Sequence, residues 1–316
     1  MSVTLDDVRR AAQRIAPFAH RTPLMTSGYF DRRLGAHCYF KCENFQKVGA
    51  FKFRGATNAV CLLSDEQASR GVVTHSSGNH AQALAAAAQT RGIAATIVMP
   101  RGAPAVKRAA VVGYGAEIVE CEPNQAAREA ACAELVARTG ATLVHPYDDP
   151  VVIAGQGTAA LEMLADAPPL DVLLAPVGGG GLLSGTAIAA HGVAPPTRII
   201  GAEPRAADDA FRSLAAGRFL PSQQPRTIAD GLLTSLGEHT FPILQAHVEA
   251  IVTVDDDSIV EAMRLVWERM KIVIEPSAAV PVAALLAEPA RFSGRHVGVI
   301  LSGGNVDLDR LPWLAR

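Results

Sequence analysis

The sequence has no apolar run long enough to cross a bilayer and no large excess of charge of either sign. Acidic residues lie near the start, M-S-V-T-L-D-D-V-R-R, where a signal peptide needs an apolar core. The formal net charge of −2 lacks the strongly basic balance typical of nucleic-acid and anionic-membrane binding. We therefore expect a cytoplasmic protein without a nucleic-acid or membrane partner.

Cysteine and aromatic residues are also scarce. The five cysteines are odd in number and form no C-x-x-C pair, which argues against a disulfide framework or a zinc site. Aromatic residues make up 5% of the chain, whereas Ala, Val, Leu and Gly are abundant, as in soluble globular proteins. The 316 residues are enough for one large domain or two ordinary ones.

Short apolar segments alternate with helix-like segments along most of the chain. The predicted strands lie at 71–76, 94–100, 116–121, 141–146, 171–177, 197–203 and 296–302. The longest predicted helix covers 256–271, where acidic residues begin the helix and basic residues end it, as the helix dipole favours. This alternation predicts an α/β protein with two open twisted-sheet domains.

A run of four glycines follows one of the predicted strands. In V-G-G-G-G-L-L-S-G, residues 177–185, backbone N–H groups can converge at a helix N-terminus and form a phosphate cradle. The spacing of Gly179, Gly181 and Gly185, with Glu203 ending the next strand, also fits a loose dinucleotide fingerprint. An NAD(P)-dependent oxidoreductase is therefore the alternative from another class, although it leaves the chain's other loops unexplained.

Two further loops carry polar residues at the ends of predicted strands. T-H-S-S-G-N-H-A-Q-A-L, residues 74–84, offers hydroxyl, amide and helix N–H groups that suit a carboxylate or a polar ring substituent. V-I-L-S-G-G-N-V-D, residues 299–307, places Ser302 and Asn305 after the last strand. In open α/β sheets ligands bind beyond the carboxyl ends of strands, so all three loops can converge on one ligand.

The stretch F-Q-K-V-G-A-F-K-F-R-G-A, residues 45–56, sets Lys52 between Phe51 and Phe53. One interpretation is a lysine that opens a helix while the phenylalanines pack on either side. The other is a nucleophilic amine, because burial disfavours the ammonium form and lowers the pKa. A desolvated lysine beside a phosphate cradle is the combination that pyridoxal phosphate chemistry requires.

Four motifs occur in a recognisable order: A-F-K-F-R-G-A, S-S-G-N-H-A-Q-A-L, V-G-G-G-G-L-L-S-G and L-S-G-G-N. In this order the chain resembles the fold-type II (tryptophan synthase β-like) pyridoxal phosphate enzymes, within them the serine/threonine dehydratase and serine racemase family. The segments A-G-Q-G-T, A-E-P, I-A-D-G and L-V-W-E-R-M-K also match the serine racemase pattern. The resemblance covers nearly the whole chain and implies pyridoxal 5′-phosphate as the cofactor.

The resemblance implies a role for each residue of these motifs. Lys52 would form the Schiff base with the cofactor aldehyde and transfer protons on one face, and Ser77 would carry protons on the other. The other implied cofactor contacts are Phe51 at the ring face, Asn79 at the phenolic oxygen, Gly178, Gly179, Gly180 and Gly181 at the phosphate, and Ser302 at the pyridine nitrogen. The implied substrate-binding residues are Ser76, Ser77, Gly78, Asn79, His80 and Arg128, the last matching an arginine linked to acidic substrates.

Two further sites are implied by the resemblance. Glu203, Asp209 and the carbonyl of Ala207 would hold Mg²⁺ or Ca²⁺, which prefer hard oxygen ligands; from the residues alone, a pair of surface acids at a helix start fits equally well. A nucleotide site in the racemases matches Lys47, Gln82, Tyr114, Lys271 and Asn305. Val48 and Gly28 stand where that pattern usually has hydroxyl-bearing residues, so the match is incomplete and activation by ATP is in doubt.

We predict a pyridoxal phosphate-dependent ammonia-lyase that converts L-threonine or L-serine to a 2-oxo acid and ammonia by β-elimination of water. A serine at 302, unlike an aspartate, would delocalise the α-carbanion less and favour rapid loss of a β-leaving group. Serine racemase and L-threo-3-hydroxyaspartate ammonia-lyase are the alternatives within the family. We expect a homodimer whose subunit has a large cofactor-binding domain (1–65 and 150–316) and a small domain with the S-S-G-N-H loop (66–149).

Overall fold

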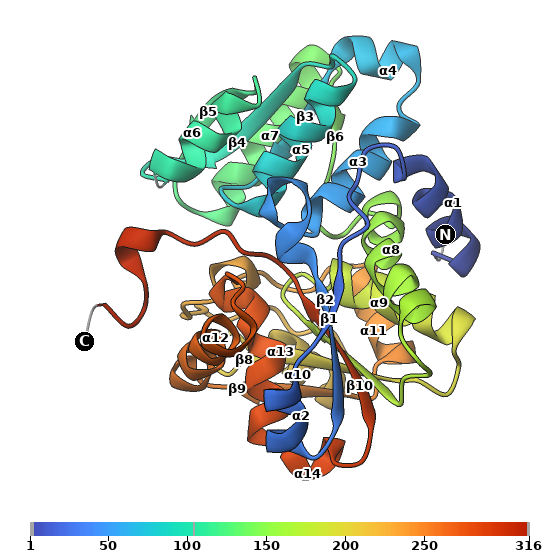
Figure 1. Ribbon diagram of the computed structural model, residues 1–316. Coiled ribbons are helices and arrows are strands. Elements are labelled where there is room, and N and C mark those ends of the chain that lie inside the picture. The colour runs from blue at the N-terminus through green and yellow to red at the C-terminus, as the bar shows by residue number, and fades with distance from the viewer. Residues whose placement is uncertain (1–2, 104, 315–316) are drawn as a thin grey trace.

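The computed structural model describes residues 3–103 and 105–314 and contains two sheets covered by helices (Figure 1). The larger sheet has the strand order β1-β2-β10-β7-β8-β9. Strand β1 is antiparallel to β2, and the other pairs in this sheet are parallel. Its strands are β1 (Leu24–Thr26), β2 (His37–Cys42), β7 (Val172–Pro176), β8 (Arg198–Pro204), β9 (Ala250–Val254) and β10 (His296–Leu301).

The smaller sheet is parallel, with the order β5-β4-β3-β6. Its strands are β3 (Val72–His75), β4 (Ala95–Pro100), β5 (Glu117–Cys121) and β6 (Thr142–Leu143). Helices α3 (Lys52–Leu62) and α5 (Asn79–Thr90) share one apolar cluster with this sheet, and α7 (Gln125–Thr139) contributes to a second. The remaining helices near it are α4 (Asp65–Arg70) and α6 (Ala105–Gly113).

Two apolar clusters lie on the two faces of the larger sheet. One combines its strands with α2 (Gly28–Leu34), α12 (Asp256–Met270) and α13 (Pro276–Ala287). The other includes α1 (Leu5–Ile15), α8 (Pro150–Asp166), α9 (Gly181–Val193) and α11 (Thr240–His247). The short helices are α10 (Asp209–Ala216), α14 (Pro289–Phe292) and the 3-10 turns η1 (Glu43–Phe45), η2 (Lys47–Gly49), η3 (Asp230–Leu232) and η4 (Leu308–Arg310).

The predicted α/β fold with two open sheets is confirmed, and each predicted strand is present. Helix α12 begins as predicted, because the Asp255 side chain accepts a hydrogen bond from the Ser258 N–H at 2.9 Å. The sequence analysis missed three strands, β1, β2 and β9. Among the described residues, no helix is both long and apolar enough to cross a membrane.

The N-terminal segment, predicted to belong to the large domain, bridges the two sheets. Strands β1 and β2 join the edge of the larger sheet, and helix α3 then packs against both α5 and α8 (Figure 1). Arg54, on α3, is fully buried and donates hydrogen bonds to Glu43 and Glu162, which ties this helix to η1, directly after β2, and to α8. Because α3 contacts both parts, the boundary near residue 65 stays a prediction.

Candidate active site

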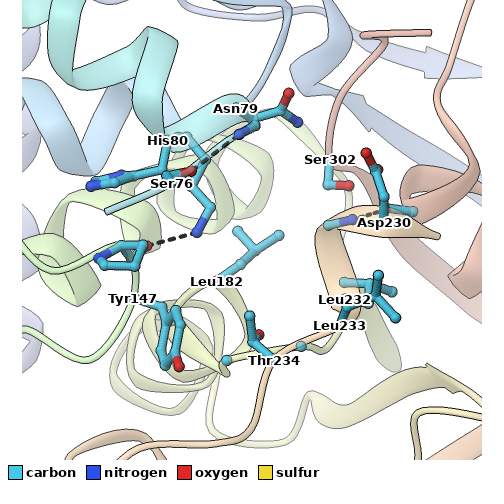
Figure 2. Close-up of a pocket in the computed structure, with 18 of the residues that line it drawn as sticks. Ser76, Asn79, His80, Tyr147, Leu182, Asp230, Leu232, Leu233, Thr234 and Ser302 are labelled. Carbon is cyan, nitrogen blue, oxygen red and sulfur yellow. Dashed lines mark hydrogen bonds between the residues drawn. The ribbon is translucent and has the colours of Figure 1, made fainter. Parts of the chain in front are cut away.

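One pocket, of about 350 Å³, brings together the loops singled out in the sequence (Figure 2). The loops that follow β3, β7 and β10 all reach it, as the rule for open sheets predicts. The predicted residues that line it are Phe51, Lys52, Ser76, Ser77, Gly78, Asn79, His80, Arg128, Gly178, Gly179, Gly180, Gly181, Ser302 and Asn305. The predicted cation-binding and nucleotide-binding residues, apart from Asn305, lie outside its lining.

Lys52 is the first residue of helix α3, and its side chain enters the pocket. The Nζ atom donates a hydrogen bond to the Pro146 carbonyl at 2.7 Å and lies 5.2 Å from the centre of the Phe51 ring. Phe53 instead points into the apolar cluster around α3 and α5. Burial lowers the pKa of Lys52 to about 8, and the Glu275 carboxylate opposes that shift. A minor but usable fraction of the amine is therefore neutral near pH 7, and this fraction grows as the pH approaches 8, as a nucleophile or proton acceptor requires.

The four-glycine loop forms the opposite side of the pocket and is buried. Gly180 adopts a φ of 87° and is the N-cap of α9, so the unpaired N–H groups of the first helical turn lie at the pocket. A Cβ atom at position 179 would lie 2.3 Å from the Tyr147 ring, so this position has room only for glycine. The loop fits the phosphate group of the implied cofactor.

The loop from Ser76 to His80 connects β3 to helix α5. Gly78 is the N-cap of α5 and makes no side-chain cap hydrogen bond, so an ordinary Ser or Asn cap does not explain this loop. Ser76 Oγ accepts a hydrogen bond from the Gly78 N–H at 3.2 Å (Figure 2). The hydroxyl of Ser77 is not used as the cap either, and remains available to the pocket as the resemblance implies.

His80 is buried at the edge of the pocket and holds the loop in place. Its Nε2 atom lies 3.2 Å from the Val144 carbonyl, and its Nδ1 atom has no partner among the described residues. Burial and the nearby charge of Lys52 hold the pKa of His80 well below its usual range. The ring is therefore neutral, with Nε2 donating to Val144.

Ser302 joins the lysine segment to the last strand. Its side chain lines the pocket, and its carbonyl accepts a hydrogen bond from the Phe51 N–H at 3.0 Å. Glu275 lies beside it, since a Cβ atom at Gly303 would be 2.8 Å from Glu275 Oε1. These contacts hold two of the predicted cofactor-binding residues, Phe51 and Ser302, in a fixed relation.

Several residues of the pocket were not singled out in the sequence. They are His75, Lys107, Tyr147, Asp230, Leu232, Leu233, Thr234, Glu275 and Ser277. Tyr147 follows β6, so the strand-end rule used for the other loops would have found it. Lys107 of α6 pairs with Asp230 of η3 across the pocket, and Asp230 belongs to the I-A-D-G segment of the racemase pattern. No periodic signal marks Glu275.

The predicted cation-binding residues lie behind the glycine loop, where β8 meets α10, and both acids are buried. They are not surface acids, so that interpretation was wrong. The Glu203 carboxylate accepts hydrogen bonds from the N–H groups of Ala210 and Phe211, and Asp209 accepts one from Leu236. Burial raises the pKa of Glu203 to about 9 and that of Asp209 to about 6. No group of three or more His, Cys, Asp or Glu suited to a metal occurs within the described ranges.

Comparison with known proteins agrees with this geometry. The family model described as "Pyridoxal-phosphate dependent enzyme" matches residues 15–303, so the chain belongs to the pyridoxal-phosphate dependent enzymes. Relatives with 52%, 50% and 47% identity are named as a dehydratase, an ammonia-lyase and a racemase, so within that family the chain is of the lyase and racemase type. The predicted fold type and the predicted cofactor are thereby confirmed.

Three named relatives are similar to the chain over nearly its whole length. The chain is 52% identical over 310 residues to the beta-hydroxyaspartate dehydratase of Paracoccus denitrificans, covering 98% of each protein. It is 50% identical over 312 residues to the L-threo-3-hydroxyaspartate ammonia-lyase of Saccharomyces cerevisiae, covering 98% of this chain and 96% of that protein. The crystal structure of serine racemase from Dictyostelium discoideum has a TM-score of 0.93 at 48% identity and covers 98% of this chain and 100% of that one. These names support the predicted alternatives, a hydroxyaspartate ammonia-lyase or a serine racemase, better than an enzyme that mainly dehydrates L-threonine or L-serine.

Proposed function

We propose that this enzyme is an ammonia-lyase for 3-hydroxyaspartate, which it converts to a four-carbon 2-oxo diacid and ammonia. The observation that carries the proposal is Arg128, which lines the substrate side of the pocket and whose buried Nε atom has no partner among the described residues. A buried guanidinium N–H without a partner is costly, and a second carboxylate on the substrate would satisfy it. L-Serine and L-threonine have no such group.

The surroundings of Arg128 support an anionic substrate. Burial, together with the nearby charge of Arg128, lowers the pKa of the His75 imidazole. The His75 ring is therefore neutral and adds a hydrogen-bonding group without competing for the anion. Two relatives with 52% and 50% identity are named for hydroxyaspartate, which favours the same substrate class.

Different residues of the pocket carry out different parts of the reaction. When bound, pyridoxal phosphate supplies an electron sink for the amino-acid α-carbon. Lys52, whose pKa of about 8 leaves part of it neutral, takes the α-proton, and its hydrogen bond to the Pro146 carbonyl orients the amine. The N–H groups at the start of α5 bind the α-carboxylate, and Arg128 binds the distal one. Loss of the β-hydroxyl as water, followed by hydrolysis, releases ammonia and the 2-oxo diacid.

A substrate panel tests this proposal. The expected result is a higher kcat/KM for one 3-hydroxyaspartate diastereomer than for L-serine or L-threonine. Arg128→Met should lower kcat/KM for 3-hydroxyaspartate on the order of 10- to 100-fold, since a charge-assisted hydrogen bond is lost, and should change that for L-serine little. Arg138→Met, an exposed arginine on the same helix, is the control. Equal losses on both substrates would contradict the assignment of Arg128.

Serine racemisation is the second candidate, and Ser77 is the observation that favours it. The pocket contains both Lys52 and a hydroxyl on the neighbouring loop, so two proton carriers are available to one substrate. A structural relative is named serine racemase. The chirality of serine recovered from an incubation with L-serine tests this activity directly.

A cation site at Glu203, Asp209 and the Ala207 carbonyl is part of the same proposal. The Oδ1 atom of Asp209 is buried and has no hydrogen-bond partner within the described ranges, which suits a ligand to Mg²⁺ or Ca²⁺. Asp209 is the first residue of α10, and the Glu203 carboxylate at the end of β8 accepts hydrogen bonds from the first turn of that helix, so a cation would stabilise α10 and the loop at Leu236. The nucleotide site, the homodimer and the cytoplasmic location stay predictions from the sequence.

A further inference from the structure

Glu275 is a buried carboxylate at the base of the pocket, 4% exposed, to which the mechanism above gives no role. It precedes helix α13 but makes no side-chain cap hydrogen bond to that helix. Its carboxylate instead faces two loops of the active site. The Asn79 Nδ2 atom donates to Oε1 at 2.9 Å and to Oε2 at 3.1 Å, and the Asn305 backbone N–H donates to Oε2 at 3.1 Å.

These hydrogen bonds form a network in which Asn305 donates to Asn79 and Asn79 donates to Glu275. Asn305 Nδ2 donates to the Val48 carbonyl at 2.7 Å and to Asn79 Oδ1 at 3.0 Å, so both of its amide hydrogens are used. With Oδ1 of Asn79 occupied as an acceptor, its Nδ2 must face Glu275. Reversing the Asn79 amide would set donor against donor at Asn305 and leave Glu275 without its donor, at a cost that a buried site makes large.

We propose that Glu275 is a positioning residue that fixes the amide orientation of Asn79 and thereby presents an N–H of Asn79 to the bound cofactor. A side-chain NH₂ group has two hydrogens, and the two oxygens that Nδ2 of Asn79 contacts belong to the single carboxylate of Glu275, so one N–H shared between them accounts for both contacts. The second N–H is then available to an acceptor in the pocket, where an anionic oxygen on the cofactor ring is the acceptor of matching chemistry. The inference rests on the proposed contact of Asn79 with the cofactor, and not on the identity of the substrate.

A second observation supports the role of Glu275 independently. A Cβ atom at position 303 would lie 2.8 Å from Oε1 and 3.0 Å from the carboxyl carbon of Glu275, so the first glycine of L-S-G-G-N makes room for this carboxylate. The Glu275 N–H also donates to the Gly303 carbonyl at 3.0 Å. The loop that carries Ser302 is therefore shaped around Glu275, which links it to the loop that carries Asn79.

The hydrogen-bond network depends on whether Glu275 is ionised. Burial raises the pKa of Glu275 to about 7, while the donors from Asn79 and Asn305 oppose the shift. The other charged groups that act on it are Asp230 and Lys107, which also line the pocket, and Lys52 within it. Above pH 7 the carboxylate is acceptor-only and holds Asn79 as described; below it, a protonated carboxyl has a hydrogen that faces donors. Cofactor affinity should accordingly fall as the pH drops through about 7.

The test is Glu275→Gln, which keeps the shape but replaces one acceptor by an NH₂ group that faces a donor. The dissociation constant of pyridoxal phosphate, from fluorescence titration of the apoprotein without substrate, should rise about tenfold or more and lose its dependence on pH near 7. The visible absorption band of the bound cofactor should shift as well. Glu288→Gln, a partly exposed carboxylate beyond the other end of α13, should change neither.

A double-mutant cycle with Asn79→Ala separates positioning from folding. If Glu275 acts through Asn79, then Glu275→Gln should have no further effect on cofactor affinity once Asn79 is alanine. Equal effects of Glu275→Gln with and without Asn79 would overturn the proposal, as would an unchanged dissociation constant and band in a variant that melts like the parent protein. Because no substrate is present, failure here is distinguishable from failure of the proposed lyase activity.

Discussion

The two sides of the pocket come from different sheets and differ in packing. On the side of the larger sheet, Gly178 to Gly181 and Ser302 are buried, and the Tyr147 ring is packed against Gly179. On the side of the smaller sheet, Ser76 to Asn79, Lys107 and Arg128 are partly exposed. A Cβ atom at Gly78 would meet nothing within 4 Å, in contrast to one at Gly179.

This difference matches the two ligands that such a site has to hold. A resident cofactor is best held by a rigid cradle whose donors are fixed before it arrives. A substrate that enters and leaves at each turnover needs a side that can adjust, and partly exposed loops are where such adjustment is least costly. Lys52 lies between the two sides, at the start of a helix that packs against both α5 and α8.

Substitution of Lys52, which lies between the two sides, should lower activity more than any other change. Lys52→Ala should lower turnover by at least the 10²- to 10⁴-fold that a positioned acid–base group supplies, and should leave the cofactor held without a covalent bond. Lys52→Arg should be equally inactive, because a guanidinium keeps the charge but does not deprotonate. Borohydride reduction of the parent protein and peptide mapping should place the cofactor on Lys52; a label on another lysine would refute the assignment.

The sequence predicted the loops on both sides of the pocket but not the residues whose partners lie far away in the chain, for a physical reason. A buried strand followed by glycines or polar residues is a local pattern, so the loops after β3, β7 and β10 could be found from their own residues. Glu275 and the Lys107–Asp230 pair gain their meaning only from partners far along the chain, which no local pattern contains.

The missed strands have a related explanation. Strand β9, A-I-V-T-V, lies at the edge of the larger sheet and begins almost directly after helix α11 ends, and β1 has only three residues. Strand β2, H-C-Y-F-K-C, carries polar residues whose partners are remote. Lys41 is fully buried because its Nζ atom donates to Glu162 at 2.6 Å, on a helix more than a hundred residues away in the chain.

The next largest effect should come from removing the cation at Glu203 and Asp209, and it should appear as a loss of thermal stability. If Mg²⁺ or Ca²⁺ binds the native state alone, it stabilises by about 2.7 kcal/mol at a hundredfold excess over the dissociation constant. Chelation should lower Tm, and Mg²⁺ should restore it. Cation binding requires ionised carboxylates, and burial raises the pKa of Asp209 to about 6 and that of Glu203 to about 9. The gain in Tm should therefore be larger at pH 8 than at pH 6 and should still increase above pH 8.

Two neighbouring aspartates, Asp209 and Asp208, provide the test variant and the control variant for that experiment. Asp209→Asn should abolish the response of Tm to Mg²⁺, whereas Asp208→Asn should keep it, because Asp208 pairs with Arg212 and is partly exposed. A parent protein whose Tm is the same in chelator and in Mg²⁺ at both pH values would exclude the cation site.

Matched glycine substitutions compare the two sides directly. Gly179→Ala places a methyl group 2.3 Å from the Tyr147 ring and should destabilise the protein by about 1–3 kcal/mol, with weaker cofactor binding. Gly78→Ala meets open space, so its cost should stay below about 1 kcal/mol, the loss expected from a poorer N-cap residue. Thermal unfolding and cofactor titration of both variants measure the contrast, and equal losses would mean that the two sides are equally rigid.

Of these substitutions, Ser77→Ala should reduce elimination least. It should selectively remove racemisation. Racemisation needs one group that removes a proton and another that delivers it on the opposite face, whereas elimination from an L-substrate needs Lys52 and an acid for the leaving hydroxyl. A serine hydroxyl is a weak acid–base group, so racemisation should already be slow beside elimination. The variant should therefore lose any formation of D-serine, on the order of 100-fold or more, and retain most of its ammonia release.

Both products can be measured from one incubation with L-serine, with the parent protein alongside. D-Serine that forms at an unchanged rate would mean that the second-face proton comes from another group, and the neutral His80, with a buried Nδ1 lacking a partner among the described residues, would be the next to substitute. An equal collapse of both products would mean that Ser77 mainly positions the substrate. In that case the loop from Ser76 to His80 is less adaptable than its exposure indicates, and the contrast between the two sides of the pocket would rest on Arg128 and Lys107 alone.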